Sequence, residues 1–291
     1  MAVQSKTLWV VLIAAVCAAV ILPWGCDSAV SPDSSEDAEV WLERGQAHAE
    51  KDEWDAAIRD YSRAIELRPE DADAYWYRGN AYADKCEYDA AIRDYTKTIE
   101  LNPEKAIAHY ARGSAYRWKG ELDAAIQDYT KAIQLDPKRA PPYHLRGTAY
   151  FEEGKHDAAF QDFARAIELD PRHPEPYVDR GIAYAKKGEN DAAIRDFTKA
   201  IHLDPKYRLA YGFRGVAHAE RDEYDAAIRD YTRVIELDPK DAHTYHLRAS
   251  MHCLKRDYDK AWADVQKCQR LGGTVNPEFL ADLREASGRE E

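Results

Sequence analysis

Cysteine is scarce in this sequence: five residues among 291, none of them spaced as a Cys-x-x-Cys pair. This scarcity excludes the disulfide framework of small secreted domains and a cysteine-based structural metal site. The sequence also lacks a glycine-rich phosphate loop, a Gly-x-Ser-x-Gly elbow and a His-Glu-x-x-His pair. We therefore expect no enzyme activity, cofactor, bound metal or small-molecule substrate.

An excess of positive charge is absent as well. The formal net charge is −12, and 32% of the residues are charged. An acidic surface repels the phosphates of DNA and RNA over most of its faces. The charge therefore excludes nucleic acid as the expected partner and says little about other partners.

Uncharged residues are concentrated at the N-terminus, where residues 7–26 read TLWVVLIAAVCAAVILPWGC. The continuous apolar part, about 17 residues, sits at the lower limit for crossing a hydrocarbon core of ~30 Å. It is longer than the roughly 7–15 apolar residues of a signal-peptide core. Three interpretations of residues 1–26 stay open: a retained signal anchor, a lipoprotein signal and a cleaved secretion signal.

The flanking residues bear on each interpretation. No Ala-x-Ala-like cleavage site is convincing, which favours the anchor, and Lys6 would keep the start of the chain cytoplasmic. Gly25-Cys26 resembles the end of a bacterial lipobox, with Cys26 as the acylated residue, although Pro23 and Trp24 depart from that motif. All three interpretations place the body on the periplasmic or extracellular side. The acidic, serine-rich residues 27–37 are typical of a flexible linker.

One phrase recurs through the rest of the chain. DAAIRDYTKTIELNPEKA at residues 89–106 returns 34 residues later as DAAIQDYTKAIQLDPKRA, and the period of 34 is kept without insertion. A fixed period of this length indicates a stacked array of supersecondary units. The array spans residues 38–271 in seven copies: 38–71, 72–105, 106–139, 140–173, 174–207, 208–241 and 242–271.

Several positions within the 34-residue unit hold the same residue type. Position 4 is usually aromatic, position 8 is Gly in six copies, position 18 is Asp and position 20 is Ala in all seven. By these positions the array resembles tetratricopeptide repeats (TPRs). The resemblance implies an all-α fold, a right-handed superhelical solenoid of tandem antiparallel helix pairs.

The repeated residues also have expected structural roles. Gly at position 8 costs up to about 1 kcal/mol of helix propensity, so its retention predicts close approach of the second helix. Asp at position 18, for example Asp89, is predicted to cap the N-terminus of that second helix. Residues 272–291 contain NPEFLADLREA, and we expect Asn276 to begin a helix that covers the last repeat.

Two charged columns run through the array. Position 7 is Arg and position 23 is Asp in every copy, as in Arg146 and Asp162. The Arg column could bind a polyanion, or it could pair with the Asp column between packed helices. We favour the paired arrangement, because a column with its own counter-charges is already neutralised.

In TPR arrays the first helices line the concave face, mainly through positions 2, 5, 9, 12 and 13. These positions vary here while the packing positions do not, and they include aromatic residues, which often mark interfaces. The candidate partner-binding residues are Leu42, Gln46, Trp76, Asn80, Tyr110, Ser114, Arg117, Trp118, His144, Thr148, Phe151, Val178 and Ile182.

Some TPRs bind the terminal carboxylate of a peptide through a Lys/Asn clamp. Asn80 occupies one matching position, but Leu42 and Trp76 stand where the Lys is expected. We therefore expect an extended or helical peptide held by aromatic pockets. The sequence predicts a membrane-anchored scaffold that binds a protein or peptide. An assembly factor of the lipoprotein or secreted type and a purely structural spacer are the alternatives.

Overall fold

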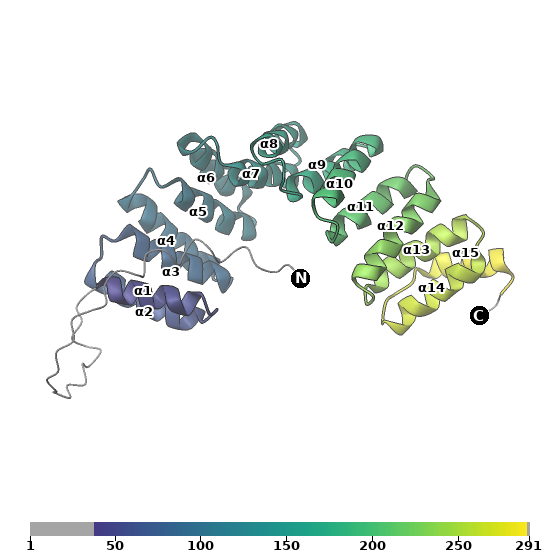
Figure 1. The fold of residues 1–291 in the computed structure, drawn as a ribbon, viewed down its shortest axis with the longest axis horizontal. Coiled ribbons are helices and arrows are strands. Elements are labelled where there is room, and N and C mark those ends of the chain that lie inside the picture. Colours follow the sequence, from purple (N-terminus) through teal and green to yellow (C-terminus); the bar gives the residue numbers. More distant parts are fainter. Residues whose placement is uncertain (1–37, 290–291) are drawn as a thin grey trace, which may run out of the picture. The chain divides into compact units, whose positions relative to one another are not determined.

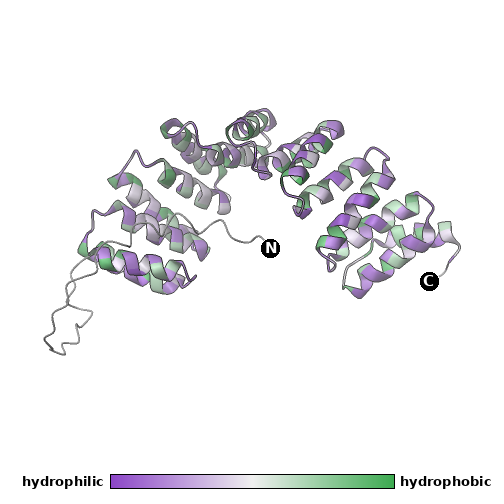
Figure 2. Ribbon diagram, viewed as in Figure 1, coloured by the Kyte–Doolittle hydropathy of each residue, from purple (hydrophilic) through white to green (hydrophobic). Residues whose placement is uncertain are grey.

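The computed structural model describes residues 38–289 of the chain. The predicted signal or anchor at 1–26, with Cys26, and the linker at 27–37 lie outside these residues. Across residues 38–289 the structure is entirely helical, without a strand. None of the helices in this range is long and apolar enough to cross a bilayer. Coloured by hydropathy, they mix hydrophilic and hydrophobic residues along their lengths (Figure 2).

Fifteen helices follow one another along the described chain (Figure 1). They are α1 (Ala38–Ala49), α2 (Trp54–Leu67), α3 (Ala72–Asp84), α4 (Tyr88–Leu101), α5 (Ala106–Trp118), α6 (Leu122–Leu135), α7 (Ala140–Glu152), α8 (His156–Leu169), α9 (Glu175–Lys186), α10 (Asn190–Leu203), α11 (Arg208–Ala219), α12 (Tyr224–Leu237), α13 (Ala242–Leu254), α14 (Tyr258–Arg270) and α15 (Pro277–Ser287).

Each odd-numbered helix from α1 to α13 packs against the even-numbered helix that follows it, and that helix packs against the next pair. The two helices of a pair run antiparallel, because the end of α1 meets the start of α2 through His48 and Glu53 while Gly45 meets Tyr61 further along. Contacts thus join neighbours in chain order, as in a solenoid. The predicted fold class, an all-α solenoid of tandem helix pairs, is confirmed.

Glycine at position 8 allows the two helices of a pair to approach closely, as predicted. A Cβ added to Gly181 would lie 2.6 Å from Cε1 of Phe197, and one added to Gly45 would lie 2.5 Å from Cε1 of Tyr61. The contact is made by the aromatic side chain at position 24 of the second helix. In both cases the three atoms nearest to the added Cβ belong to this ring and not to the alanine at position 20.

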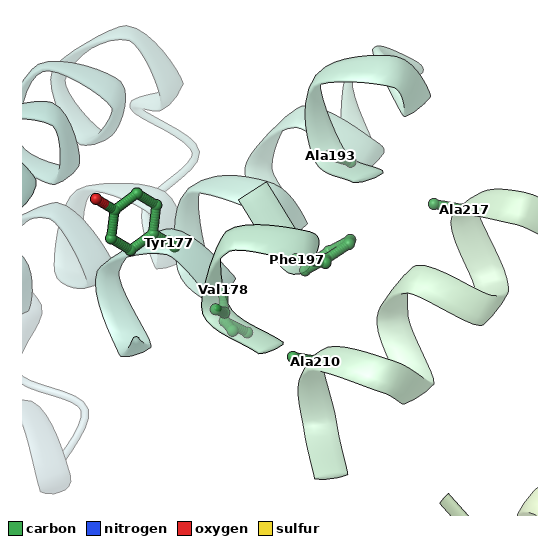
Figure 3. Packing of buried hydrophobic residues seen from close by; sticks show 7 residues of the cluster. Tyr177, Val178, Ala193, Phe197, Ala210 and Ala217 are labelled. Atoms are coloured by element: carbon green, nitrogen blue, oxygen red, sulfur yellow. The ribbon is translucent and has the colours of Figure 1, made fainter. Parts of the chain in front are cut away.

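Buried residues connect each pair to the next. Phe197 on α10 packs in one cluster with Val178 of the same repeat and with Ala210 and Ala217 of α11 (Figure 3). The alanines leave room for the ring between the helices. The second helix of each repeat is therefore buried on two sides, against the first helix of its own repeat and against the first helix of the next. A single helix pair could not bury this apolar surface by itself.

The predicted capping role of Asp at position 18 is wrong. α2 begins at Trp54, so Asp55 lies inside its first turn, and Glu53 at the N-cap makes no side-chain capping bond. Asp55 instead accepts a hydrogen bond from Nζ of Lys85 in the next repeat, at 2.7 Å. The carboxylate thus joins two repeats, and its place in the first turn is also favoured by the helix dipole.

The C-terminal helix covers the last repeat, as predicted. Oδ1 of Asn276 accepts a hydrogen bond from the Glu278 backbone N–H at 2.8 Å, and Pro277 occupies the first turn of α15. Leu283 is fully buried against Ala261, Trp262 and other residues of the seventh repeat. The solenoid therefore ends in a helix whose outer face is polar.

Candidate partner-binding groove

The two charged columns pair with each other throughout the array. In every repeat Nε and Nη2 of the position-7 Arg bind the two carboxylate oxygens of the position-23 Asp, at 2.6 to 2.9 Å. The Asp carboxylates are buried, with at most 9% of the side chain exposed. This confirms the predicted pairing and leaves no Arg column for a polyanion.

Successive first helices lie next to one another along the array. We call the surface formed by α1, α3, α5, α7, α9, α11 and α13 the first-helix face. Three cavities open between its helices, and each takes part of its lining from predicted contact positions. These cavities are the places where a ligand could insert side chains.

The first cavity lies between α1 and α3 and has a volume of about 410 Å³. Its lining comprises Gln46, Ala49, Glu50, Trp54, Tyr61, Tyr77, Asn80, Ala81 and Asp84. Burial and the nearby Asp52 raise the pKa of Asp84. Burial, and then Tyr77, Asp60 and Glu50, raise the pKa of Tyr61 to about 12. Carboxylates and aromatic rings therefore share this cavity.

The second cavity, of about 170 Å³, lies among α5, α7 and α9. The predicted contact residues Tyr110 and His144 both line it. His144 Nε2 lies 2.7 Å from Asp179 Oδ2, and Thr148 donates to the same oxygen at 3.3 Å. The hydrogen-bonding groups of His144 and Thr148 are therefore already occupied by Asp179 within the protein.

The third cavity, of about 240 Å³, lies between α11 and α13 and is mostly apolar. Leu209, Phe213 and Val216 line it from α11 and are 50%, 38% and 39% exposed. Their spacing of 4 and then 3 residues places them on one face of the helix. Leu247 on α13 forms the opposite wall, and Gly212 leaves the centre open.

The remaining predicted residues differ in accessibility. Trp118 is 68% exposed and stacks on Tyr88 with ring centroids 6.4 Å apart. Arg117 Nη2 donates to Glu152 Oε1 at 2.6 Å, and Ser114 Oγ accepts from the Tyr129 hydroxyl at 3.3 Å. Four others are half-buried among their neighbours: Leu42, Trp76, Phe151 and Ile182.

Val178 is 2% exposed and packs against Phe197, so its side chain cannot reach a ligand in this structure.

Phe213 lines the third cavity but was not predicted from the sequence, because it occupies position 6, outside the positions that line the concave face in TPR arrays. The 4-and-3 spacing with Leu209 and Val216 is the signal that could have identified it. Within residues 38–289 no three His, Cys, Asp or Glu side chains lie together in an arrangement that could hold a metal ion.

Comparison with known families agrees with this architecture. Models described as TPR repeat or tetratricopeptide repeat match residues 45–86, 79–118, 106–139, 145–212 and 209–241. No curated protein matches the chain.

Solved structures resemble the described array. MamA is 28% identical with a TM-score of 0.52, over 59% of this chain and 94% of MamA. YrrB, a TPR protein with an unusual peptide-binding site, is 25% identical with a TM-score of 0.53, over 65% of this chain and 97% of YrrB. The C-terminal part of a TPR repeat-containing protein from Cytophaga hutchinsonii shares the fold at 23% identity, with a TM-score of 0.66 over 83% of this chain and 99% of its own.

Proposed function

Because the chain belongs to the tetratricopeptide repeat family, we propose that it is a non-enzymatic scaffold that binds a peptide segment of a protein partner on its first-helix face. TPR folds serve as protein-interaction scaffolds, and the similar protein YrrB has a peptide-binding site. Binding is the only biochemistry in this proposal.

The observation that carries the proposal is the apolar cavity between α11 and α13. Three large apolar side chains of α11 stay exposed there: Leu209, Phe213 and Val216. Contiguous exposed apolar residues around an open cavity mark interaction sites. An extended or helical peptide could insert an apolar side chain between Leu209, Phe213 and Leu247.

We further propose that the N-terminal apolar segment places the array outside the cytoplasm, anchored at the membrane. The sequence of residues 7–26 supports this location, because it is uncharged and long enough to reach across a bilayer. Lipid attachment at Cys26 is the alternative form of the same anchor. A secreted assembly factor and a structural spacer are the alternative roles.

A capture experiment tests the binding function. The full chain, solubilised with its membrane, is compared with a Leu209→Ser/Val216→Ser double variant and with Trp118→Ala by quantitative mass spectrometry of co-purified proteins. Both variants change exposed side chains, so melting temperatures should stay close to that of the parent. We expect partners bound by the parent to be depleted from the double variant.

Val40→Ser is the matched control, because Val40 is a 48% exposed apolar residue of α1 that lines none of the three cavities. It should retain all partners. If the double variant, Trp118→Ala and the control all recover the same proteins, the first-helix face is not the binding surface and the spacer role gains support.

A further inference from the structure

Two carboxylates face the cavity between α1 and α3 without a cation to match them. Glu50 and Asp84 occupy position 13 of the first and second repeats, and both line this cavity. Neither makes an ion pair within residues 38–289. Lys85, which follows Asp84 in the chain, is held by Asp55 at 2.7 Å and by Glu87 at 2.6 Å.

One other repeat junction shows what can fill this place. Between α5 and α7, Arg117 at position 12 reaches Glu152 at position 13 of the next repeat, with Nη2 to Oε1 at 2.6 Å. The same step of 35 residues joins Ala49 to Asp84, and both of these residues line the cavity. Where the third repeat supplies a guanidinium, the first repeat has a methyl group and an open space.

The walls of the cavity also suit a guanidinium. Burial raises the pKa of the Tyr129 hydroxyl, while its hydrogen bond to Ser114 and the charge of the nearby Arg117 oppose that rise. Tyr61 holds the equivalent place in the first repeat. Tyr61 stacks on Tyr77 with centroids 5.8 Å apart, and both rings line the cavity together with Trp54. Aromatic faces bind cations, and arginine stacks on them in particular.

The Tyr61 hydroxyl is also available to a ligand. The equivalent hydroxyl of Tyr95 donates to Asn80 Oδ1 at 2.8 Å, and that of Tyr129 donates to Ser114 at 3.3 Å. Among residues 38–289 the Tyr61 hydroxyl has no such partner, and Tyr61 lines the cavity. The cavity therefore offers a hydroxyl as well as two carboxylates and three aromatic rings.

We infer that the α1–α3 cavity is a specific subsite for an arginine side chain of the bound partner, which takes the place that Arg117 fills between α5 and α7. This inference rests on the proposed function and names the residue type that the first-helix face recognises at its N-terminal end. Glu50 and Asp84 pair with the guanidinium, and Tyr61 and Tyr77 pack against it. Arginine fits better than lysine, because a planar fork can bind carboxylates and stack on a ring at the same time.

A small probe tests the subsite without any partner. N-acetylarginine methylamide is titrated into the 15N-labelled full chain, and amide shifts around Asn80 and Asp84 are followed by NMR. N-acetylcitrulline methylamide, which has the same shape without the charge, is the matched ligand. We expect saturable binding of the arginine probe, at least about 5-fold tighter than that of the citrulline probe.

Variants then test the assigned residues. Asp84→Asn and Glu50→Gln should each weaken binding of the arginine probe by about 5-fold or more. Glu152→Gln removes a carboxylate that is already paired within the protein, so it should leave the probe affinity unchanged. Ala49→Arg should abolish probe binding and raise the melting temperature, and adding Asp84→Asn should cancel that rise.

Equal binding of the two probes, or an unchanged affinity in Asp84→Asn, would overturn the arginine subsite. Because no partner takes part, this result is separate from the capture experiment on Leu209 and Val216. A chain that captures partners through α11 but ignores the arginine probe would retain the scaffold function and lose only the subsite.

Discussion

The guanidinium of Arg146 binds the carboxylate of Asp162 through two hydrogen bonds, Nε to Oδ2 at 2.7 Å and Nη2 to Oδ1 at 2.8 Å. Its third nitrogen, Nη1, donates to Thr130 Oγ1 of the preceding repeat at 2.9 Å. The pair therefore connects α7 to α8 and one repeat to the next. Five of the seven Arg–Asp pairs make the same link to a hydroxyl of the preceding repeat.

Replacing this arginine should lower stability without affecting partner binding. Arg146→Met leaves the buried Asp162 carboxylate unpaired, which we expect to cost about 3 kcal/mol of unfolding free energy. Chemical denaturation measures this loss, and the capture experiment measures binding. The double variant Arg146→Met/Asp162→Leu should recover much of the loss, because it removes the unpaired charge. Lost binding at unchanged stability would instead make the Arg column a ligand site.

Two glycines should respond in opposite directions to the same substitution. Gly181→Ala places a Cβ 2.6 Å from Phe197 Cε1, and the overpacking should destabilise the protein by about 1–3 kcal/mol. Gly212→Ala meets no atom within 4 Å inside a helix, so it should stabilise by about 0.5–1 kcal/mol. Thermal unfolding of the two variants checks both signs, and a shift of the same sign in both would refute the close-packing argument.

Removing the core side chain of the capping helix should have a local effect. Leu283→Ala deletes a fully buried side chain and should cost about 2–5 kcal/mol at the C-terminal end. Because contacts in a solenoid join only neighbours, hydrogen exchange should accelerate in α13 and α14 and stay unchanged in α1 and α2. Ala286→Ser, an exposed change on the same helix, is the control. Uniform acceleration along the chain would argue for one global core instead.

Stability should fall as the pH drops below the ordinary pKa of histidine, about 6.5. Protonation of His246 should account for part of this loss. Burial, together with His243, lowers the pKa of His246, whose ring meets Phe279 of α15 with centroids 5.3 Å apart. The folded state thus binds the proton less readily than the unfolded state. The contribution of neutral His246 to the free energy of unfolding is complete above about pH 6.5 and is lost as the pH falls through the lowered pKa. Thermal unfolding at several pH values should show a smaller loss in His246→Gln than in the parent, and equal losses would exclude His246 as a source.

The N-terminus should determine where the array is found. Mass spectrometry of the mature chain separates the three forms: an intact N-terminus for an anchor, a lipid-modified Cys26, or a cleaved peptide. Cys26→Ser should leave membrane association intact if residues 7–26 are a retained anchor. Release of this variant from the membrane would instead assign the lipoprotein form.

The sequence alone determined the architecture, because a period of 34 residues repeats the same packing problem seven times. The close helix approach at the position-8 Gly and the pairing of the Arg and Asp columns could be predicted without coordinates, because these residues recur at fixed positions of every two-helix repeat. The capping helix was equally visible, because Asn276, Pro277 and Leu283 follow local rules of helix initiation and amphipathicity. These features depend on neighbours that are close in sequence or one repeat away.

The tertiary structure decided which residues remain accessible. Exposure depends on how far each helix is rotated against its neighbours, and the sequence pattern does not specify that rotation closely enough. Val178 and Phe213 show the consequence: an expected contact residue is buried, and an unexpected one lines a cavity. The unmatched carboxylates of Glu50 and Asp84 became visible only when the structure placed Arg117 against Glu152, because an ion pair between repeats is a property of packed helices rather than of either helix alone.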